Sequence, residues 1–228
     1  MSLVELMVGL ALGLFLVAGA ATLFVSHLGN SRRMLVEARM AQDMRAAGDL
    51  ITRDLRRAGY WANSLQGTVA TGAGSVTVPN PYRTITPNAG SSQIEYQYSR
   101  DTTENNALDA NEQFGFRLNG GAIQMKVNGT PTWQTVTDPD LVTITAFTLA
   151  PTETPIDIRD SCAKACCGNA DVTAGTCATA NVTACPTISV RQYVLTLAGR
   201  SATDASVRRT LQTRVRVRND GLAGSCPA

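Results

Sequence analysis

Histidine and aromatic residues are scarce in this chain, and both shortages narrow its possible functions. His27 is the only histidine among 228 residues, which argues against a histidine-based catalytic relay and against a multi-histidine metal site. Aromatic residues make up 5% of the sequence, whereas Thr, Ala, Val and Gly are abundant, which favours strands and turns over a helical bundle. No P-loop occurs, and the net charge of +2 indicates neither a nucleic-acid machine nor a strongly acidic surface. We therefore expect a protein that is not an enzyme and carries no cofactor.

Charge is absent from a long stretch near the start of the chain. No charged residue occurs from Leu6 to Val25, and no basic residue precedes this apolar run, as one would in a secretory signal peptide. At 1.5 Å per residue the run would span about 30 Å as a helix, enough to cross a bilayer. We expect residues 1–28 to form a transmembrane or filament-core segment. Its representative apolar residues are Leu6, Leu10, Leu14, Val17 and Leu23.

Residues 29–60 carry the pattern of an amphipathic helix. Opposite charges recur four residues apart, as in Arg33 and Glu37, and such pairs support a helix in water. No proline interrupts residues 1–58, so the sequence predicts one helix over about residues 1–58. Apolar side chains recur at spacings of three and four and form one stripe. The stripe consists of Val36, Met40, Met44, Ala47, Ile51 and Leu55.

The remaining part, residues 61–228, predicts a globular β-rich domain. Residues 61–92 are dense in Gly, Ser, Thr, Asn and Pro and predict a connecting region. The Asn119-Gly120 step lies between two alternating segments and predicts a hairpin turn. The order of elements predicts an α+β domain whose long helix packs across an antiparallel sheet. Strands are expected at 93–98, 113–118, 122–127, 141–150, 187–198 and 206–218.

The cysteines are confined to the last third of the chain, and none of them forms a CxxC pair. Zinc-ribbon and thioredoxin-type spacings are therefore absent, and disulfides formed in an oxidising compartment are favoured. Most of the cysteines lie in residues 151–185, which we expect to be a disulfide-rich insertion between two strands. Spacing does not choose a connectivity, although adjacent cysteines rarely bond to each other. The six are Cys162, Cys166, Cys167, Cys177, Cys185 and Cys226.

Two charged patterns each allow more than one interpretation. An acidic loop at 99–113 could bind calcium, but its spacing is not that of an EF-hand, so a solvated loop without metal is favoured. The last predicted strand alternates arginine with apolar residues. It could contact phosphates, but without interleaved aromatic residues a solvent-facing or subunit-facing strand is favoured. The acidic residues are Asp101, Glu104, Asp109 and Glu112, and the arginines are Arg208, Arg214, Arg216 and Arg218.

The N-terminal residues "SLVELMVGLALG" resemble the start of mature type IV pilins and type II secretion pseudopilins. In that family a dedicated peptidase removes a short leader and methylates the new first residue. Glu at the fifth mature position is the family's signature, and Glu5 falls on it. Met1 stands where the family usually has Phe, either as a substitution or as an added initiator. The resemblance implies the pilin fold, and it gives Met1 and Glu5 roles in processing and assembly. Glu5 of an incoming subunit would pair with the amino group of Met1 on its neighbour.

A second resemblance involves the end of the predicted helix. The segment "RDLRRAGYW" at 53–61 resembles the end of the long helix in PilW-type minor pilins, and "TRVRVRND" at 213–220 is similar to their last strand. The matching residues at the helix end are Arg53, Asp54, Leu55, Arg56, Ala58, Gly59 and Tyr60.

The resemblance implies a minor pilin of a type IV pilus that helps to prime assembly at the filament tip. The alternatives are a type II secretion pseudopilin, a filament-forming subunit in its own right, and a membrane-anchored periplasmic adhesion or binding module. Expected partners are other minor pilins, the major pilin, the inner-membrane assembly platform and the prepilin peptidase, but not nucleic acid. Before assembly the protein would lie in the inner membrane with a periplasmic globular domain, and afterwards in the extracellular pilus.

Overall fold

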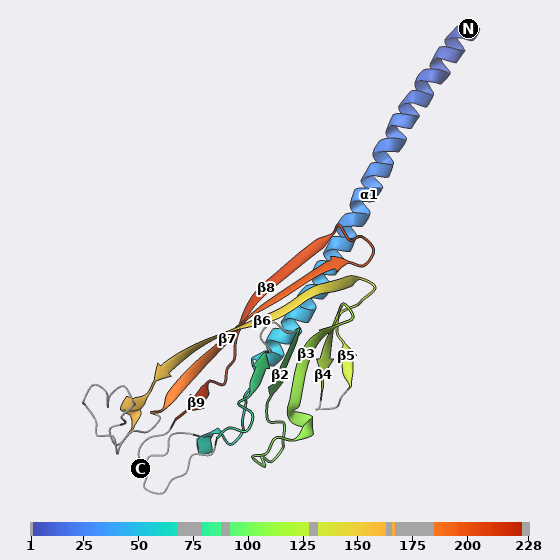
Figure 1. Cartoon of the computed structure of the whole chain (residues 1–228). Helices are drawn as coiled ribbons and strands as arrows, with labels where there is room; N and C mark the ends of the chain where they lie inside the picture. The colour runs from blue at the N-terminus through green and yellow to red at the C-terminus, as the bar shows by residue number, and fades with distance from the viewer. Residues whose placement is uncertain are drawn as a thin grey trace.

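One long helix and two antiparallel sheets make up the fold of this protein (Figure 1). The computed structural model describes residues 2–67, 79–87, 92–127, 132–162, 166 and 185–224. The α+β class predicted from the sequence is confirmed. Short 3₁₀ helices lie at Ser64–Gly67, Ala110–Glu112 and Arg159–Ser161.

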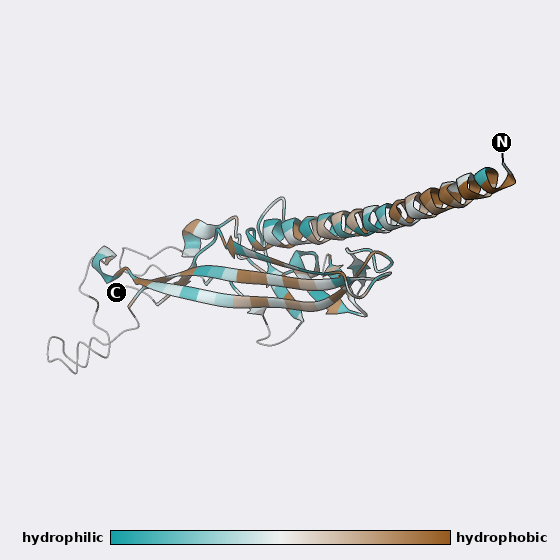
Figure 2. Ribbon diagram, turned by 90° about the horizontal axis from the view of Figure 1, so that it is seen from above, coloured by the Kyte–Doolittle hydropathy of each residue, from teal (hydrophilic) through white to brown (hydrophobic). Residues whose placement is uncertain are grey.

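Helix α1 runs from Leu3 to Leu55 without interruption, slightly inside the predicted bounds. Its first half extends away from the rest of the molecule, and hydrophobic residues concentrate there (Figures 1 and 2). The second half packs against the sheet that contains β7 and β8. The predicted apolar stripe is confirmed from Met40 onward, whereas Val36 is half-buried. The buried members are Met40, Met44, Ala47, Ile51 and Leu55.

The strands form two sheets rather than the single sheet expected. Sheet A has the order β1-β2-β3-β4-β5 with every pair antiparallel. Its strands are β1 (Ile85–Pro87), β2 (Gln93–Gln97), β3 (Gln113–Asn119), β4 (Ala122–Lys126) and β5 (Trp133–Thr135). In sheet B, β7 pairs with β6 on one side and with β8 and β9 on the other. Its strands are β6 (Val142–Asp157), β7 (Thr187–Ser201), β8 (Arg208–Arg216) and β9 (Gly221–Ala223).

Two local predictions were displaced along the chain. The hairpin turn between β3 and β4 lies at Gly120-Gly121 and not at Asn119-Gly120, because Asn119 still pairs with Ala122. Both glycines have positive φ, of 59° and 78°, as this two-residue turn requires. The insertion begins after Asp157 and not at 151, because β6 continues to Asp157, which pairs with Thr187.

The core lies between α1 and the two sheets, and aromatic residues fill much of its sheet A side. Tyr96 stacks on both Phe114 and Phe116, and Tyr98 stacks on Phe114 with ring centroids 4.0 Å apart. The sheets join where the Ile144 N–H donates to the Gly121 carbonyl at 2.7 Å. Alternating side chains of sheet B complete the core, including Leu195 and Leu197 from the central strand.

Candidate functional site

The first half of α1 presents bare apolar side chains to its surroundings. The structure contains one helix long and apolar enough to cross a membrane, and none of that apolar stretch is buried within the described chain. An apolar surface of this extent is unfavourable in water, and by its length and composition this stretch could anchor the chain in a membrane. Thr22 is the one conventional polar side chain within the run, and its hydroxyl donates to the Gly19 carbonyl at 2.8 Å. The predicted residues are all exposed: Leu6, Leu10, Leu14, Val17 and Leu23.

Glu5 lies in the first turn of α1, at the free end of the molecule. Its backbone N–H donates to the Ser2 carbonyl at 3.0 Å. The Glu5 carboxylate is exposed and has no hydrogen bond or ion pair within the described residues. A carboxylate in the first turn is favoured by the helix dipole, but that alone does not offset its transfer into an apolar environment. Met1 lies outside the described residues, so the proposed pairing of Glu5 with an N-terminus stays a prediction.

The end of α1 and the last part of β8 meet in one junction, which we call the helix-end junction (residues 53–61 and 213–220). The Arg218 N–H donates to the Arg56 carbonyl at 3.1 Å. The Asn219 side-chain amide donates to the carbonyls of Arg57 and Ala58 at 3.4 and 3.1 Å. These bonds satisfy carbonyls that a helix leaves without partners at its C-terminus. The two segments singled out in the sequence are therefore one structural unit.

Gly59 makes the turn that ends this helical segment. Its φ is +75°, and its N–H donates to the Gln97 carbonyl of sheet A at 2.8 Å. A Cβ at this position would lie 3.0 Å from Nη2 of Arg191. The position therefore favours glycine for its backbone conformation, and an added Cβ would also require Arg191 to shift by a few tenths of an ångström.

Arg191 on β7 is a buried residue that the sequence reasoning missed. It is 7% exposed, and its Nη1 and Nη2 atoms donate to the carbonyls of Arg83 and Asn219 at 2.7 and 2.8 Å. It thereby ties the connecting region and the segment after β8 to the centre of sheet B. Its burial could have been predicted from the sequence. Arg191, Tyr193 and Leu195 are spaced two residues apart in the strand, so the three side chains lie on the same, inward-facing side of β7.

Asp54 and Arg57 attach the helix end to sheet A. Asp54 is 5% exposed, and the Tyr96 hydroxyl donates to its Oδ2 at 3.3 Å. Burial and the neighbouring Asp54 carboxylate raise the pKa of Tyr96 well above its ordinary value, so it remains a donor. The Arg57 guanidinium lies 4.4 Å above the Tyr98 ring, a cation–π contact. Leu55 and Ala58 are fully buried beside them.

The acidic loop is braced by its own hydrogen bonds. Glu112 is fully buried and accepts from the N–H groups of Arg100 and Asp109, both at 2.9 Å. The Tyr82 hydroxyl lies 2.9 Å from Glu104 Oε1 and 3.2 Å from Glu112 Oε1. Burial, together with these two carboxylates, raises the pKa of Tyr82.

Three of the four predicted acidic residues converge. Carboxylate oxygens of Asp101, Asp109 and Glu112 lie within 4.8 Å of one another, a spacing that could hold a cation, whereas Glu104 is not part of this group. Since Glu112 already braces the loop, the group has a structural explanation, and the expectation of a loop without metal stays a prediction.

The structure shows one complete disulfide in the cysteine-rich part. Cys166 bonds to Cys185 with their Cα atoms 5.6 Å apart, and Cys162 is also disulfide-bonded. Cys166 therefore does not bond to its neighbour, as expected. Cys167, Cys177 and Cys226 lie outside the described residues.

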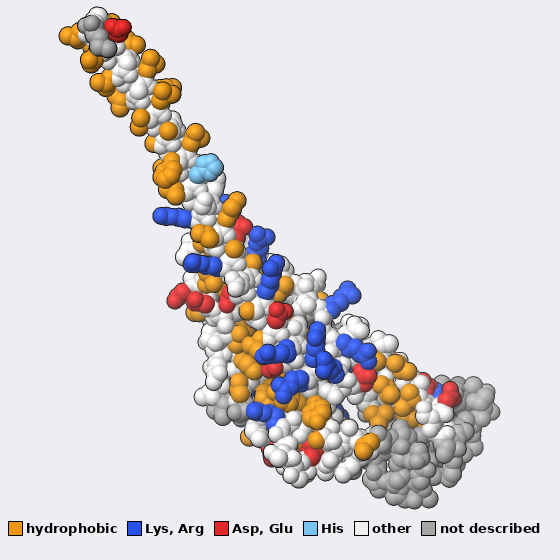
Figure 3. All heavy atoms as spheres, turned by 180° about the vertical axis from the view of Figure 1, so that it is seen from behind, with side chains coloured by type: hydrophobic (Ala, Val, Ile, Leu, Met, Phe, Trp, Pro, Cys, Tyr) orange, Lys and Arg blue, Asp and Glu red, His pale blue; other side chains and the backbone are white. Residues whose placement is uncertain are grey.

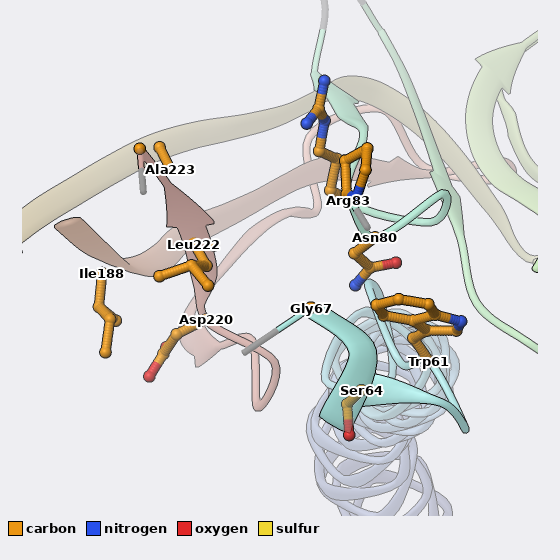
Figure 4. A pocket seen from close by; sticks show the side chains of 12 residues that line it. Trp61, Ser64, Gly67, Asn80, Arg83, Ile188, Asp220, Leu222 and Ala223 are labelled. Carbon is orange, nitrogen blue, oxygen red and sulfur yellow. The ribbon is translucent and has the colours of Figure 1, made fainter. Parts of the chain in front are cut away.

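A cavity of about 380 Å³ lies beside the helix-end junction. Ile188 and Leu222 line it on one side, across from Trp61 and Asn80 (Figure 4). Asp220 also lines it, and one oxygen of that carboxylate is buried without a hydrogen-bond partner among the described residues. The indole N–H of Trp61 donates to Asn106 Oδ1 at 3.0 Å, so this N–H already has a hydrogen-bond acceptor within the protein. The described residues that line the cavity are partly apolar and partly polar, and they include no constellation that indicates catalysis.

A helix with a bare apolar half and a packed amphipathic half, joined to antiparallel sheets, defines a pilin-related protein. Residues 33–217 match the family described as prepilin peptidase-dependent protein B, and the chain belongs to that family. It is a pilin-related structural family and not an enzyme family. The match covers the amphipathic half of α1 and most of the globular part, and it begins after the apolar half. No curated protein and no solved structure matches the chain.

Proposed function

We propose that this protein is a minor pilin of a type IV pilus and that its N-terminal helix incorporates it into the filament. The observation that carries this proposal is the bare apolar half of α1, which is continuous with a half that is packed into the globular domain. One rigid element thus joins a segment that requires an apolar environment to a domain that is stable in water. Before assembly that environment would be the inner membrane, and after assembly it would be the apolar helices of neighbouring subunits.

Glu5 would determine the axial register of the incoming subunit. A carboxylate at the centre of a bilayer costs about 2.5–3.5 kcal/mol on insertion scales, so a position that offers a positive charge is favoured over its neighbours. The N-terminal amino group of an adjacent subunit is positively charged at neutral pH. Pairing of Glu5 with that group would select one axial register, whereas contacts between the surrounding apolar side chains are compatible with many registers.

The subunit would act with other minor pilins in a complex that primes polymerisation of the major pilin. Such a complex would lower the nucleation barrier and would remain at or near the filament tip. The family description supports processing by a prepilin peptidase. An inner-membrane assembly platform would be the further partner during insertion into the filament.

Glu5→Gln tests the proposal, because it removes the charge and keeps the size of the side chain. The matched control is Asp49→Asn, an exposed carboxylate on the packed half of the same helix. We expect the Glu5 variant to remain in the membrane at its normal level, with filaments reduced about tenfold or more, the factor that corresponds to about 1.4 kcal/mol. The control should assemble normally. An unchanged filament level in cells that carry the Glu5 variant, with the protein found in membranes and not in filaments, would overturn the proposal in favour of a membrane-anchored binding module.

The abundance of the subunit in sheared filaments separates the related alternatives. Quantitative mass spectrometry of the sheared fraction should find this chain at a trace ratio to a smaller major pilin, with a methylated N-terminal peptide. A high ratio would make it the main subunit of its own filament. Absence from sheared material, with the protein intact in membranes, would favour a secretion pseudopilin or an anchored module.

A further inference from the structure

Some side chains of the helix-end junction make contacts that hold the fold together, whereas others are exposed and make no such contact. Asp54, Arg57 and Gly59 bind sheet A or make the turn, and Asn219 caps the helix end. In contrast, Arg53, Arg56, Arg214 and Arg218 are exposed, and their side chains make no hydrogen bond, ion pair or ring contact within the described part of the chain. Arg216 is exposed as well, and its Nη2 contacts Asp220 at 3.2 Å.

Three of these exposed arginines share one surface, which we call the arginine patch (Arg56, Arg216 and Arg218). Arg56, Arg216 and Arg218 line a shared open hollow of about 480 Å³. Arg53 precedes Arg56 by three residues and is therefore its neighbour on the helix surface. Arg214 lies on the same side of β8 as Arg216. Seen from behind, the globular part shows a gathering of Lys and Arg side chains (Figure 3).

On the basis of the proposed function, we infer that the arginine patch docks a carboxylate-bearing surface of an adjacent pilin-class subunit. The patch carries three positive charges, and Asp220 is the one carboxylate that the described structure pairs with it. Like charges this close repel one another, and an acidic partner surface would relieve that repulsion. Guanidinium groups bind carboxylates through two parallel hydrogen bonds, which fixes orientation as well as charge.

The position of the patch on α1 supports a neighbouring subunit as the partner. One side of the second half of α1 packs against β7 and β8, and Arg53 and Arg56 lie on the side that remains exposed. When the bare apolar halves of several helices associate, this exposed side of the same continuous helix faces the neighbouring subunits. Tyr60, 49% exposed, follows in the same segment, and tyrosine and arginine are among the residues most typical of protein interfaces.

A nucleic acid fits the patch less well. A phosphate backbone is bound by an extended track of positive charge, whereas here Asp220 lies inside the patch and the whole chain has a net charge of only +2. Aromatic side chains that could stack on bases do not alternate with these arginines in β8.

Lysine substitution allows the contact to be trapped in cells that assemble the pilus. Arg56→Lys keeps the charge and introduces an amine, which a carbodiimide couples to a carboxylate in direct contact. The matched control is Arg200→Lys, an exposed arginine at the opposite end of β7. Mass spectrometry should find the amine introduced at position 56 joined to an Asp or Glu of another pilin-class subunit, and no such product from the control variant. Absence of a product at position 56 from assembled filaments would contradict the contact.

Charge reversal measures what the contact contributes. The variant Arg53→Glu/Arg56→Glu/Arg218→Glu should keep its membrane level and its Cys166–Cys185 disulfide, with filaments reduced about tenfold, as expected when a favourable charge contact becomes repulsive. The corresponding triple lysine variant keeps the charge but loses the two parallel hydrogen bonds, so it should assemble better than the triple Glu variant. Normal assembly of the triple Glu variant, with Glu5→Gln defective, would overturn this inference and leave the proposed function intact. If Glu5→Gln also assembles normally, the proposed function itself fails. DNA binding by the purified protein that the triple Glu variant loses, without a cross-link from position 56, would reassign the patch to nucleic acid.

Discussion

Replacing Gly59 with alanine should destabilise the helix-end junction by more than its backbone conformation alone requires. The residue has a φ of +75°, a region in which an L-residue costs about 1 kcal/mol more than glycine. The added Cβ would also lie 3.0 Å from Arg191 Nη2, which donates to the Asn219 carbonyl. Shifting this buried guanidinium weakens its charged hydrogen bond to that acceptor, at a cost of about 2 kcal/mol more. We therefore expect Gly59→Ala to lower the free energy of unfolding by about 3 kcal/mol.

Gly120→Ala separates the two contributions. Gly120 has a φ of +59°, but an added Cβ there meets nothing within 4 Å, so only the conformational cost of about 1 kcal/mol applies. Urea unfolding of the full chain in detergent micelles can be followed by the fluorescence of Trp61 and Trp133. Gly59→Ala should lose about 2 kcal/mol more than Gly120→Ala. Equal losses in the two variants would refute the role given to Arg191 at this turn.

Two further predictions concern other buried contacts. Tyr96→Phe removes the hydroxyl that donates to Asp54, and it should cost about 1–2 kcal/mol in the same unfolding assay. The loss should shrink in an Asp54→Asn background, and fully additive losses would contradict the pairing. For Glu104, burial raises the pKa, but hydrogen bonds from Ser99, the Asn106 N–H and Tyr82 outweigh it, so its pKa lies below 4.5. This stabilisation is complete above pH 4.5 and is lost as the pH falls through the folded-state pKa. The hydrogen-exchange protection of the Asn106 amide should therefore decline on acidification below pH 4.5, and Glu104→Gln should abolish the decline. A decline that persists in this variant would assign it to another group.

The helix and most strands were predictable because their patterns are local. Met40, Met44 and Ile51 recur with the period of a helix, and burial of one face follows from that spacing alone. The division into two sheets was not predictable, because alternation shows which face of a strand is buried but not which strand lies beside it. The turn moved by one residue because two adjacent glycines, Gly120 and Gly121, follow Asn119, and either step can make a two-residue turn.

The extension of β6 past residue 150 shows a second way in which local patterns mislead. The insertion was predicted to begin at residue 151, yet Pro151 and Pro155 lie in a regular ladder opposite Tyr193 and Ser189. β6 is at an edge of sheet B, where a proline is tolerated because its missing N–H can face away from the neighbouring strand. Only the position of the strand in the sheet makes this sequence compatible with a strand.

The candidate site was predictable in its parts but not in its assembly. Glu5 and the bare apolar helix follow from the order of residues alone, and so do the two arginine-containing segments. Their meeting depends on the packing of β8 beside the end of α1, which no local pattern encodes. From the sequence alone, the exposed arginines of the two segments are expected to be separate solvated residues. The fold brings Arg56 and Arg218 together.

The closure of the helix-end junction also has a consequence for the order in which the chain can fold. Asn219 bonds to the Arg57 carbonyl across a sequence separation of 162 residues, so the end of α1 is completed by residues that are synthesised long after it. Until they emerge, the partners of the carbonyls of residues 56–58 and one acceptor of Arg191 are missing, and the core cannot close around the helix. Contacts this distant in sequence close slowly. The helix-end junction of a nascent chain would thus remain open until Arg218 and Asn219 have emerged, and truncation just before Arg218 would leave this junction without its partners.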